Sequence, residues 1–128
     1  MFHYTAWPDH GVPKDPSLLF EICHSLSQLN VNCTVVHCSA GVGRTGVFIA
    51  LMKLLEVCQS NACYLNVFQT VLDLRKNRKF MVGSSKNILK NNGKLMIFIF
   101  FHLKVMNATQ YKFLYSAIST YMNMLEEG

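Results

Sequence analysis

Residues 37–46 read HCSAGVGRTG, and this stretch decides how the rest of the sequence is interpreted. It follows a short β-branched apolar run, CTVV at 33–36, which is typical of a buried strand. It leads into an apolar helical pattern over residues 45–57. A glycine-rich turn between a strand and a helix aims several backbone N–H groups at one point, beside the positive end of the helix dipole. The sequence therefore predicts an anion-binding loop over residues 39–43.

The two ends of this loop carry residues suited to covalent chemistry on a bound phosphoryl group. Cys38 would lie beneath the anion, where the N–H groups, the helix dipole and Arg44 all favour thiolate over thiol. Arg44 comes six positions later and can bind two phosphoryl oxygens through its planar guanidinium. Thr45 can form a hydrogen bond with the sulfur. We therefore expect a cysteine nucleophile and an arginine that clamps the phosphate.

A dinucleotide-binding interpretation competes for the same residues. Residues 41–46 match G-x-G-x-x-G, between a predicted strand and a predicted helix. That motif calls for an acidic residue about 20 positions later, on the next strand. The acids nearby, Glu56 and Asp73, fall on predicted helices, and dinucleotide binding does not explain Cys38 and Arg44. This interpretation is therefore kept only as a minor alternative.

A second motif, WPDHGVP, occupies residues 7–13. An aspartate between a tryptophan and prolines on a loop can swing over a substrate and deliver a proton. A phenolate that leaves phosphorus needs such an acid, because cysteine attacks phosphorus but cannot protonate the departing oxygen. Asp9 is therefore the candidate general acid.

Further elements follow from the spacing of apolar residues. Helices are expected over 16–29, with Asp15 as the capping residue and Pro16 at the first position, over 65–79, and over 108–125. Residues 83–94 are rich in Gly, Ser, Asn and Lys and predict a flexible loop. The apolar run 95–101 that follows is interpreted as either a buried strand or an aggregation-prone segment. The apolar positions of the three helices are Leu18, Leu19, Ile22, Leu26 and Leu29, then Val67, Phe68, Val71, Leu72 and Leu74, then Tyr111, Leu114, Tyr115, Ile118, Tyr121 and Leu125.

Composition limits the class of protein. The chain has 128 residues, of which 51% are hydrophobic and 15% charged, which predicts one folded domain at most. Its net charge of +5 favours anionic partners, but no basic motif with interleaved aromatics suggests nucleic acid. The first residues do not form a signal peptide, and the run 95–101 is far shorter than the roughly 20 residues of a membrane helix.

The five cysteines form an odd set with no CxxC pair and no Cys/His metal spacing. This pattern indicates free thiols, a reducing compartment and no metal site. Only Cys38 has a reactive context. The others are expected to be small buried hydrophobic residues: Cys23, Cys33, Cys58 and Cys63.

The two motifs together resemble those of the protein-tyrosine phosphatases that are specific for phosphotyrosine. The matching residues are FHYTAWPDHGVP at 2–13 and VVHCSAGVGRTG at 35–46, and the first of these looks like receptor-type members. The resemblance covers 1–82 and 106–125, with residues 83–105 as an insertion. The fold it implies is α/β, a partial phosphatase fold with the remnant of a mixed central sheet flanked by helices.

The resemblance also implies a role for each matched residue. Cys38 would form a phosphocysteine, Arg44 would clamp the phosphate, and Asp9 would act first as acid and then as the base that activates water. His37 and Thr45 would tune the thiolate. The phosphate loop would consist of Ser39, Ala40, Gly41, Val42, Gly43 and Arg44, with Gln110 as a further substrate-binding residue. The implied reaction needs no cofactor or metal, and the implied partners are phosphotyrosine-containing proteins.

The sequence departs from the family in three ways. The family's N-terminal half is expected to be absent, so Val35 and Val36 would lack sheet neighbours and leave apolar surface exposed. Residues 83–105 interrupt a segment that is continuous in the family. The glutamine that positions the hydrolytic water in the family falls on Met106, whose thioether cannot hold water as an amide does. Gln110 matches the family's next glutamine.

We therefore interpret the sequence as the C-terminal half of a protein-tyrosine phosphatase domain, an enzyme by family resemblance. The alternative is a catalytically inactive fragment that binds phosphotyrosine. The expected location is the cytoplasm or the cytoplasmic face of a membrane protein, because this chain contains no membrane segment while a parent protein could be anchored.

Overall fold

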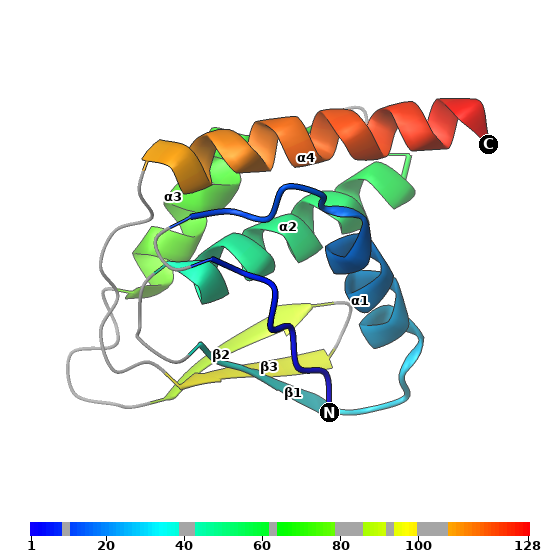
Figure 1. The fold of residues 1–128 in the computed structure, drawn as a ribbon. Coiled ribbons are helices and arrows are strands. Elements are labelled where there is room, and N and C mark those ends of the chain that lie inside the picture. The colour runs from blue at the N-terminus through cyan, green and yellow to red at the C-terminus, as the bar shows by residue number, and fades with distance from the viewer. Residues whose placement is uncertain (9–10, 39–42, 62–63, 79–85, 92–93, 100–107) are drawn as a thin grey trace.

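The computed structural model describes residues 1–8, 11–38, 43–61, 64–78, 86–91, 94–99 and 108–128. Within these residues the chain is mostly helical and also contains a small sheet (Figure 1). In chain order the elements are α1 (Ser17–Gln28), β1 (Cys33–Val36), α2 (Arg44–Gln59), α3 (Val67–Arg78), β2 (Lys86–Asn91), β3 (Lys94–Ile99) and α4 (Ala108–Glu127). The four predicted helices and the strand at 33–36 are confirmed within two residues at every end.

The sheet has the strand order β1-β3-β2. β1 pairs with β3 in parallel, with Cys33 opposite Leu95 and Val36 opposite Phe98. β2 pairs with β3 in antiparallel orientation, with Lys86 opposite Ile99. A mixed sheet is therefore present, as the expected α/β class requires, although helices dominate the described residues.

Two expectations about this region were wrong. Residues 83–94 were expected to form a loop, but Lys86–Asn91 is a strand. β3 pairs with all six of these residues, and such pairing outweighs the low strand propensity of the segment. β1 was expected to lack neighbours, but β3 pairs with it along its whole length. Val35 is nevertheless 49% exposed, so the expected exposure of apolar surface holds at this residue. Whether residues 83–105 are an insertion relative to the family stays a prediction.

The core lies around α2, which packs against both α3 and α4. Figure 1 shows α4 crossing above α2, with the sheet below α2. α2 buries residues on most of its surface, among them Val47, Leu51 and Leu54, each no more than 1% exposed. α4 contributes a buried face whose members recur at three- and four-residue spacing: Gln110, Phe113, Leu114, Ala117 and Ile118.

The buried faces of the outer helices are rotated from the expected ones. In α1 the buried residues are Leu19, Phe20 and Cys23, while Leu18 is 48% exposed. In α4 Tyr115 and Leu125 are exposed, although both were expected on the apolar face. Apolar side chains occupy more than one face of these two helices, so their spacing alone did not indicate which face is buried.

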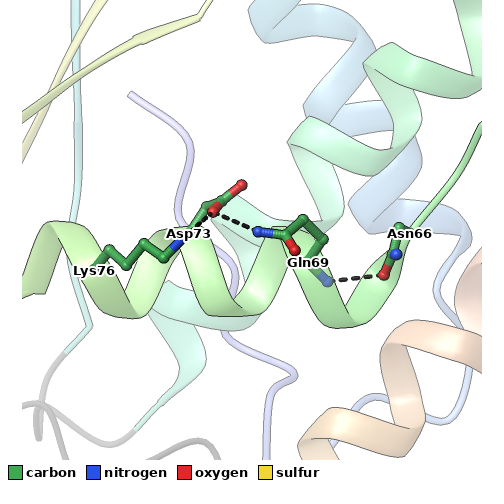
Figure 2. Close-up of polar contacts among 4 residues, drawn as sticks. All are labelled: Asn66, Gln69, Asp73 and Lys76. Atoms are coloured by element: carbon green, nitrogen blue, oxygen red, sulfur yellow. Dashed lines mark hydrogen bonds and ion pairs between the residues drawn. The ribbon is translucent and has the colours of Figure 1, made fainter.

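Local hydrogen bonds define where two helices begin. Asp15 Oδ1 accepts hydrogen bonds from Ser17 N at 2.9 Å and Ser17 Oγ at 2.7 Å, so it binds an N–H group of the first turn of α1 as expected, although the N-cap residue is Pro16, one position later. Asn66 caps α3 in the same way, because its Oδ1 accepts a hydrogen bond from Gln69 N at 2.8 Å. Figure 2 shows the chain of contacts continuing along α3 from Gln69 to Asp73 and Lys76.

Candidate active site

β1 and α2 hold the two ends of the cysteine loop. His37 and Cys38 directly follow β1, and Gly43 is the N-cap of α2, whose first residue is Arg44. Gly43 has a φ of 61°, a left-handed conformation that favours glycine. Val47 N donates a hydrogen bond of 2.9 Å to Gly43 O, which closes the first turn of α2. The strand before the glycine-rich segment and the helix N-terminus after it are therefore both present, as the sequence predicted.

The charge distribution at this helix end suits an anion. α2 has no acidic residue in its first turn, so no side chain of that turn offsets the positive end of its dipole. Cys38 and Arg44 are both half-buried, and His37 is exposed. Thr45 is only 3% exposed, and its Oγ1 has no hydrogen-bond partner among the described residues. The predicted loop residues Ser39, Ala40, Gly41 and Val42 lie outside the described residues.

The tryptophan loop is closed by hydrogen bonds on both sides of its tip. Trp7 Nε1 donates to Gly11 O at 2.9 Å, and Gly11 N donates to Pro8 O at 3.2 Å. A Cβ on Gly11 would come within 3.0 Å of Pro8 Cγ, so the turn leaves little room for a side chain at this position. Asp9, the candidate general acid, lies between these residues in sequence but outside the described part of the chain.

The first turns of α4 contact both motifs. The carboxamide of Gln110 packs against Gly43: a Cβ there would lie 3.2 Å from Gln110 Cδ. Gln110 is only 1% exposed. Phe113, on the same face of α4, lies with its ring centroid 6.3 Å from that of Trp7. α4 therefore joins the end of the cysteine loop to the start of the tryptophan loop.

Phe113 is a contact of the tryptophan loop that the sequence pattern did not indicate. Its spacing from Gln110, Leu114 and Ala117 is that of one helical face, which indicates that Phe113 is buried but not that it contacts Trp7. Tyr4 also packs against Trp7: their ring centroids lie 6.0 Å apart, and the ring planes are nearly perpendicular. Burial, and secondly the charge of Asp15, raise the pKa of the Tyr4 hydroxyl.

The remaining cysteines differ from one another. Cys23 is buried, and burial raises the pKa of its thiol to about 12. Burial also raises the pKa of Cys58, which is half-buried. Cys33 is exposed on β1, so its expected burial was wrong: it lies with Val35 on the exposed face of the strand. Cys63 lies outside the described residues.

Neither a metal site nor a membrane span is found in the part of the chain that the structure describes. No group of three or more His, Cys, Asp or Glu side chains there is arranged to hold a metal ion. Among the same residues, no helix has the length and apolarity needed to cross a bilayer.

Comparison with known families adds an independent observation. Residues 1–89 match the family model described as protein-tyrosine phosphatase. The match contains both motifs and extends beyond residue 82, where the sequence resemblance was expected to pause. No solved structure matches the chain.

Three curated relatives carry receptor-type names. The chain is 44% identical over 86 residues to receptor-type tyrosine-protein phosphatase eta of Gallus gallus, covering 63% of this chain and 6% of the relative. It is 46% identical over 86 residues to receptor-type tyrosine-protein phosphatase H of Homo sapiens, covering 63% and 8%. It is 43% identical over 82 residues to receptor-type tyrosine-protein phosphatase C of Rattus norvegicus, covering 62% and 6%. The chain thus spans less than a tenth of the length of these relatives.

Proposed function

The chain belongs to the protein-tyrosine phosphatase family, and we propose that it is the C-terminal half of a receptor-type catalytic domain, built to hydrolyse phosphotyrosine through a cysteinyl-phosphate. Its substrates are phosphotyrosine-containing proteins, and it acts in the cytoplasm or at the cytoplasmic face of a membrane. It uses neither a metal nor a cofactor.

In the first step the Cys38 thiolate attacks phosphorus and forms the S–P bond. The bond from phosphorus to the tyrosine oxygen breaks, and the departing phenolate takes a proton from Asp9. Arg44 and the N–H groups of residues 39–43 bind the three other phosphoryl oxygens, where negative charge is held in the transition state. His37 and Thr45 tune the thiolate, Thr45 through the hydroxyl that is buried at the start of α2.

In the second step a water molecule attacks phosphorus and the S–P bond breaks. Asp9, now a carboxylate, accepts the proton of this water, and Cys38 leaves as a thiolate, which restores the starting state apart from the released phosphate. Met106 stands where the family has the glutamine that positions this water. We therefore expect the second step to be the slow one.

One observation carries this proposal: α4 contacts both motifs from a single face. Gln110 lies against Gly43 and Phe113 lies against Trp7. Two motifs far apart in sequence are therefore linked through one rigid helix, which is the arrangement that a nucleophile loop and an acid loop need in order to act on one substrate.

The second candidate is a phosphotyrosine-binding fragment without turnover. Met106 favours it, because a thioether offers no hydrogen bond of an amide's strength to the hydrolytic water. Under this candidate, Arg44 and the loop still bind the phosphate of a phosphotyrosine, but the reaction does not proceed to free phosphate.

The two candidates differ in the kinetics of phenol release. With an aryl phosphate, the enzyme proposal predicts a burst of phenol followed by slow turnover, because Cys38, Arg44 and Asp9 suffice for the first step. Asp9→Ala should slow the burst most for poor leaving groups, which need protonation. Tight phosphopeptide binding without a burst would favour the binding fragment, and the absence of both would refute the proposed function.

A further inference from the structure

A surface hollow of about 410 Å³ lies between the segment after the tryptophan loop and α4. Val12, Pro13, Lys14 and Pro16 line one side of it. Figure 1 shows this blue segment running beside α4 before it enters α1. The volume falls within the range of small-molecule sites, roughly 300–1,000 Å³.

The polar lining of the hollow is positively charged. Lys14 from the loop and Lys112 from α4 both line it, so two cationic residues on different elements border one space. No acidic side chain lines the hollow. Asp15, the carboxylate next to Lys14 in sequence, already accepts hydrogen bonds from Ser17 N and Ser17 Oγ. Two cations that share a space are stabilised by an anion placed between them.

Two hydroxyl groups that line the hollow already donate hydrogen bonds within α4. Ser116 Oγ donates to Phe113 O at 3.0 Å, and Thr120 Oγ1 donates to Ser116 O at 3.0 Å. Their hydrogens are therefore used within α4, and the lysines are the principal donors left for an anion. Thr109 lines the end of the hollow nearest the start of α4, where the helix dipole adds positive potential and the first turn has no acid.

The rest of the lining is apolar. Val12 and Pro16 are half-buried, whereas Pro13 and Phe113 are buried. A bare inorganic ion would leave the exposed parts of Val12 and Pro16 in contact with water, whereas a ligand with an apolar body would cover them. We propose that the hollow is a second ligand site, separate from the cysteine loop, for a small organic anion whose charged group meets Lys14 and Lys112 and whose apolar body covers Val12 and Pro16.

The proposal does not depend on catalysis, because its test measures binding to the full chain. Naphthalene-1-sulfonate serves as the probe, titrated by calorimetry, with methanesulfonate as the matched anion that lacks an apolar body. We expect Lys14→Gln and Lys112→Gln each to weaken naphthalene-1-sulfonate binding about threefold or more, the scale of one exposed charge contact. Methanesulfonate should bind much more weakly than the probe.

Two controls test whether the probe binds in this hollow rather than elsewhere on the surface or at the cysteine loop. Lys76→Gln removes the same charge from α3, away from the hollow, and should leave the affinity unchanged. The probe should also leave the alkylation rate of Cys38 unchanged, since the cysteine loop is a different site. Equal weakening by Lys76→Gln, equal binding of the two sulfonates, or protection of Cys38 by the probe would each overturn the proposal.

Discussion

The carboxamide of Gln110 occupies the space that a side chain on Gly43 would need. Gly43 has a φ of 61°, and a Cβ there would lie 3.2 Å from Gln110 Cδ and 3.4 Å from Nε2, with Oε1 nearer still. Gln110 is 1% exposed, so its amide has little room to withdraw. The turn into α2 therefore depends on glycine for two separate reasons, its backbone conformation and the buried amide beside it.

Gly43→Ala should therefore destabilise the chain by about 2 kcal/mol or more, because the left-handed conformation alone costs about 1–2 kcal/mol for an L-residue. Urea unfolding followed by circular dichroism measures the loss. The Gln110→Ala background separates the two causes, because it removes the steric contact and keeps the strain. Gly43→Ala should cost less there, with a coupling energy of about 0.5 kcal/mol or more. An equal cost in both backgrounds would show that the contact does not matter.

Thiol labelling should distinguish the cysteines. Iodoacetate at mildly acidic pH should modify Cys38 first, because the loop and the start of α2 favour its thiolate. Cys23 should be the slowest of the described cysteines, since a thiol with a pKa of about 12 holds almost no thiolate at that pH. Cys33 is the internal control: it is exposed, but it stands at the start of β1, at the opposite end of the strand from the loop. Vanadate or phosphate should protect Cys38 and leave Cys33 unaffected, and equal rates for all cysteines would contradict the anion-loop interpretation.

The cap of α1 should make stability depend on acid pH. The hydrogen bonds from the Ser17 side chain and backbone lower the pKa of Asp15. A carboxyl group with a depressed folded-state pKa stabilises the fold above its unfolded pKa of about 4, and this contribution is lost as pH falls through the folded value. Asp15→Asn keeps an acceptor for Ser17 but cannot titrate. Between about pH 6 and about pH 3, the thermal midpoint of the parent chain should therefore fall more than that of Asp15→Asn. Parallel pH profiles of the two midpoints would contradict the role of Asp15.

The cap of α3 offers a test at neutral pH. Asn66→Ala removes the acceptor for Gln69 N and should cost about 1 kcal/mol of unfolding free energy, whereas Asn66→Asp keeps an acceptor and should cost less. Lys76→Ala, which removes only the exposed contact with Asp73, should cost less than about 0.5 kcal/mol (Figure 2). A larger effect at Lys76 than at Asn66 would show that the exposed ion pair, rather than the cap, holds this helix.

Local sequence signals predicted the elements that are defined by short-range chemistry. The strand before Cys38, the helix after Gly43 and the cap at Asp15 all depend on neighbouring residues, and all were identified. Long-range contacts were not accessible in this way. The pairing of β2 with β3 makes the polar segment Lys86–Asn91 part of a sheet, and the exposure of Cys33 depends on which face of β1 the rest of the chain covers.

The same difference between local signals and long-range contacts applies to the candidate site. The motif spacing singled out Cys38 and Arg44, and the resemblance named Gln110 as a substrate-binding residue without its contact with Gly43. The contact between Phe113 and Trp7 joins residues more than a hundred positions apart, so no local pattern reveals it. The predicted roles of all the site residues stay predictions, and Asp9, residues 39–42 and Met106 also lie outside the described part of the chain.

The central claim is that Cys38 forms a covalent phosphoryl intermediate. The most direct measurement is mass spectrometry of the chain quenched in acid shortly after mixing with an aryl phosphate. We expect the mass of one phosphoryl group to be added to the peptide that contains Cys38, in step with the burst of phenol, and both signals to be absent in Cys38→Ser. Phenol release without a phosphorylated Cys38 peptide, or a burst that persists in Cys38→Ser, would contradict the account.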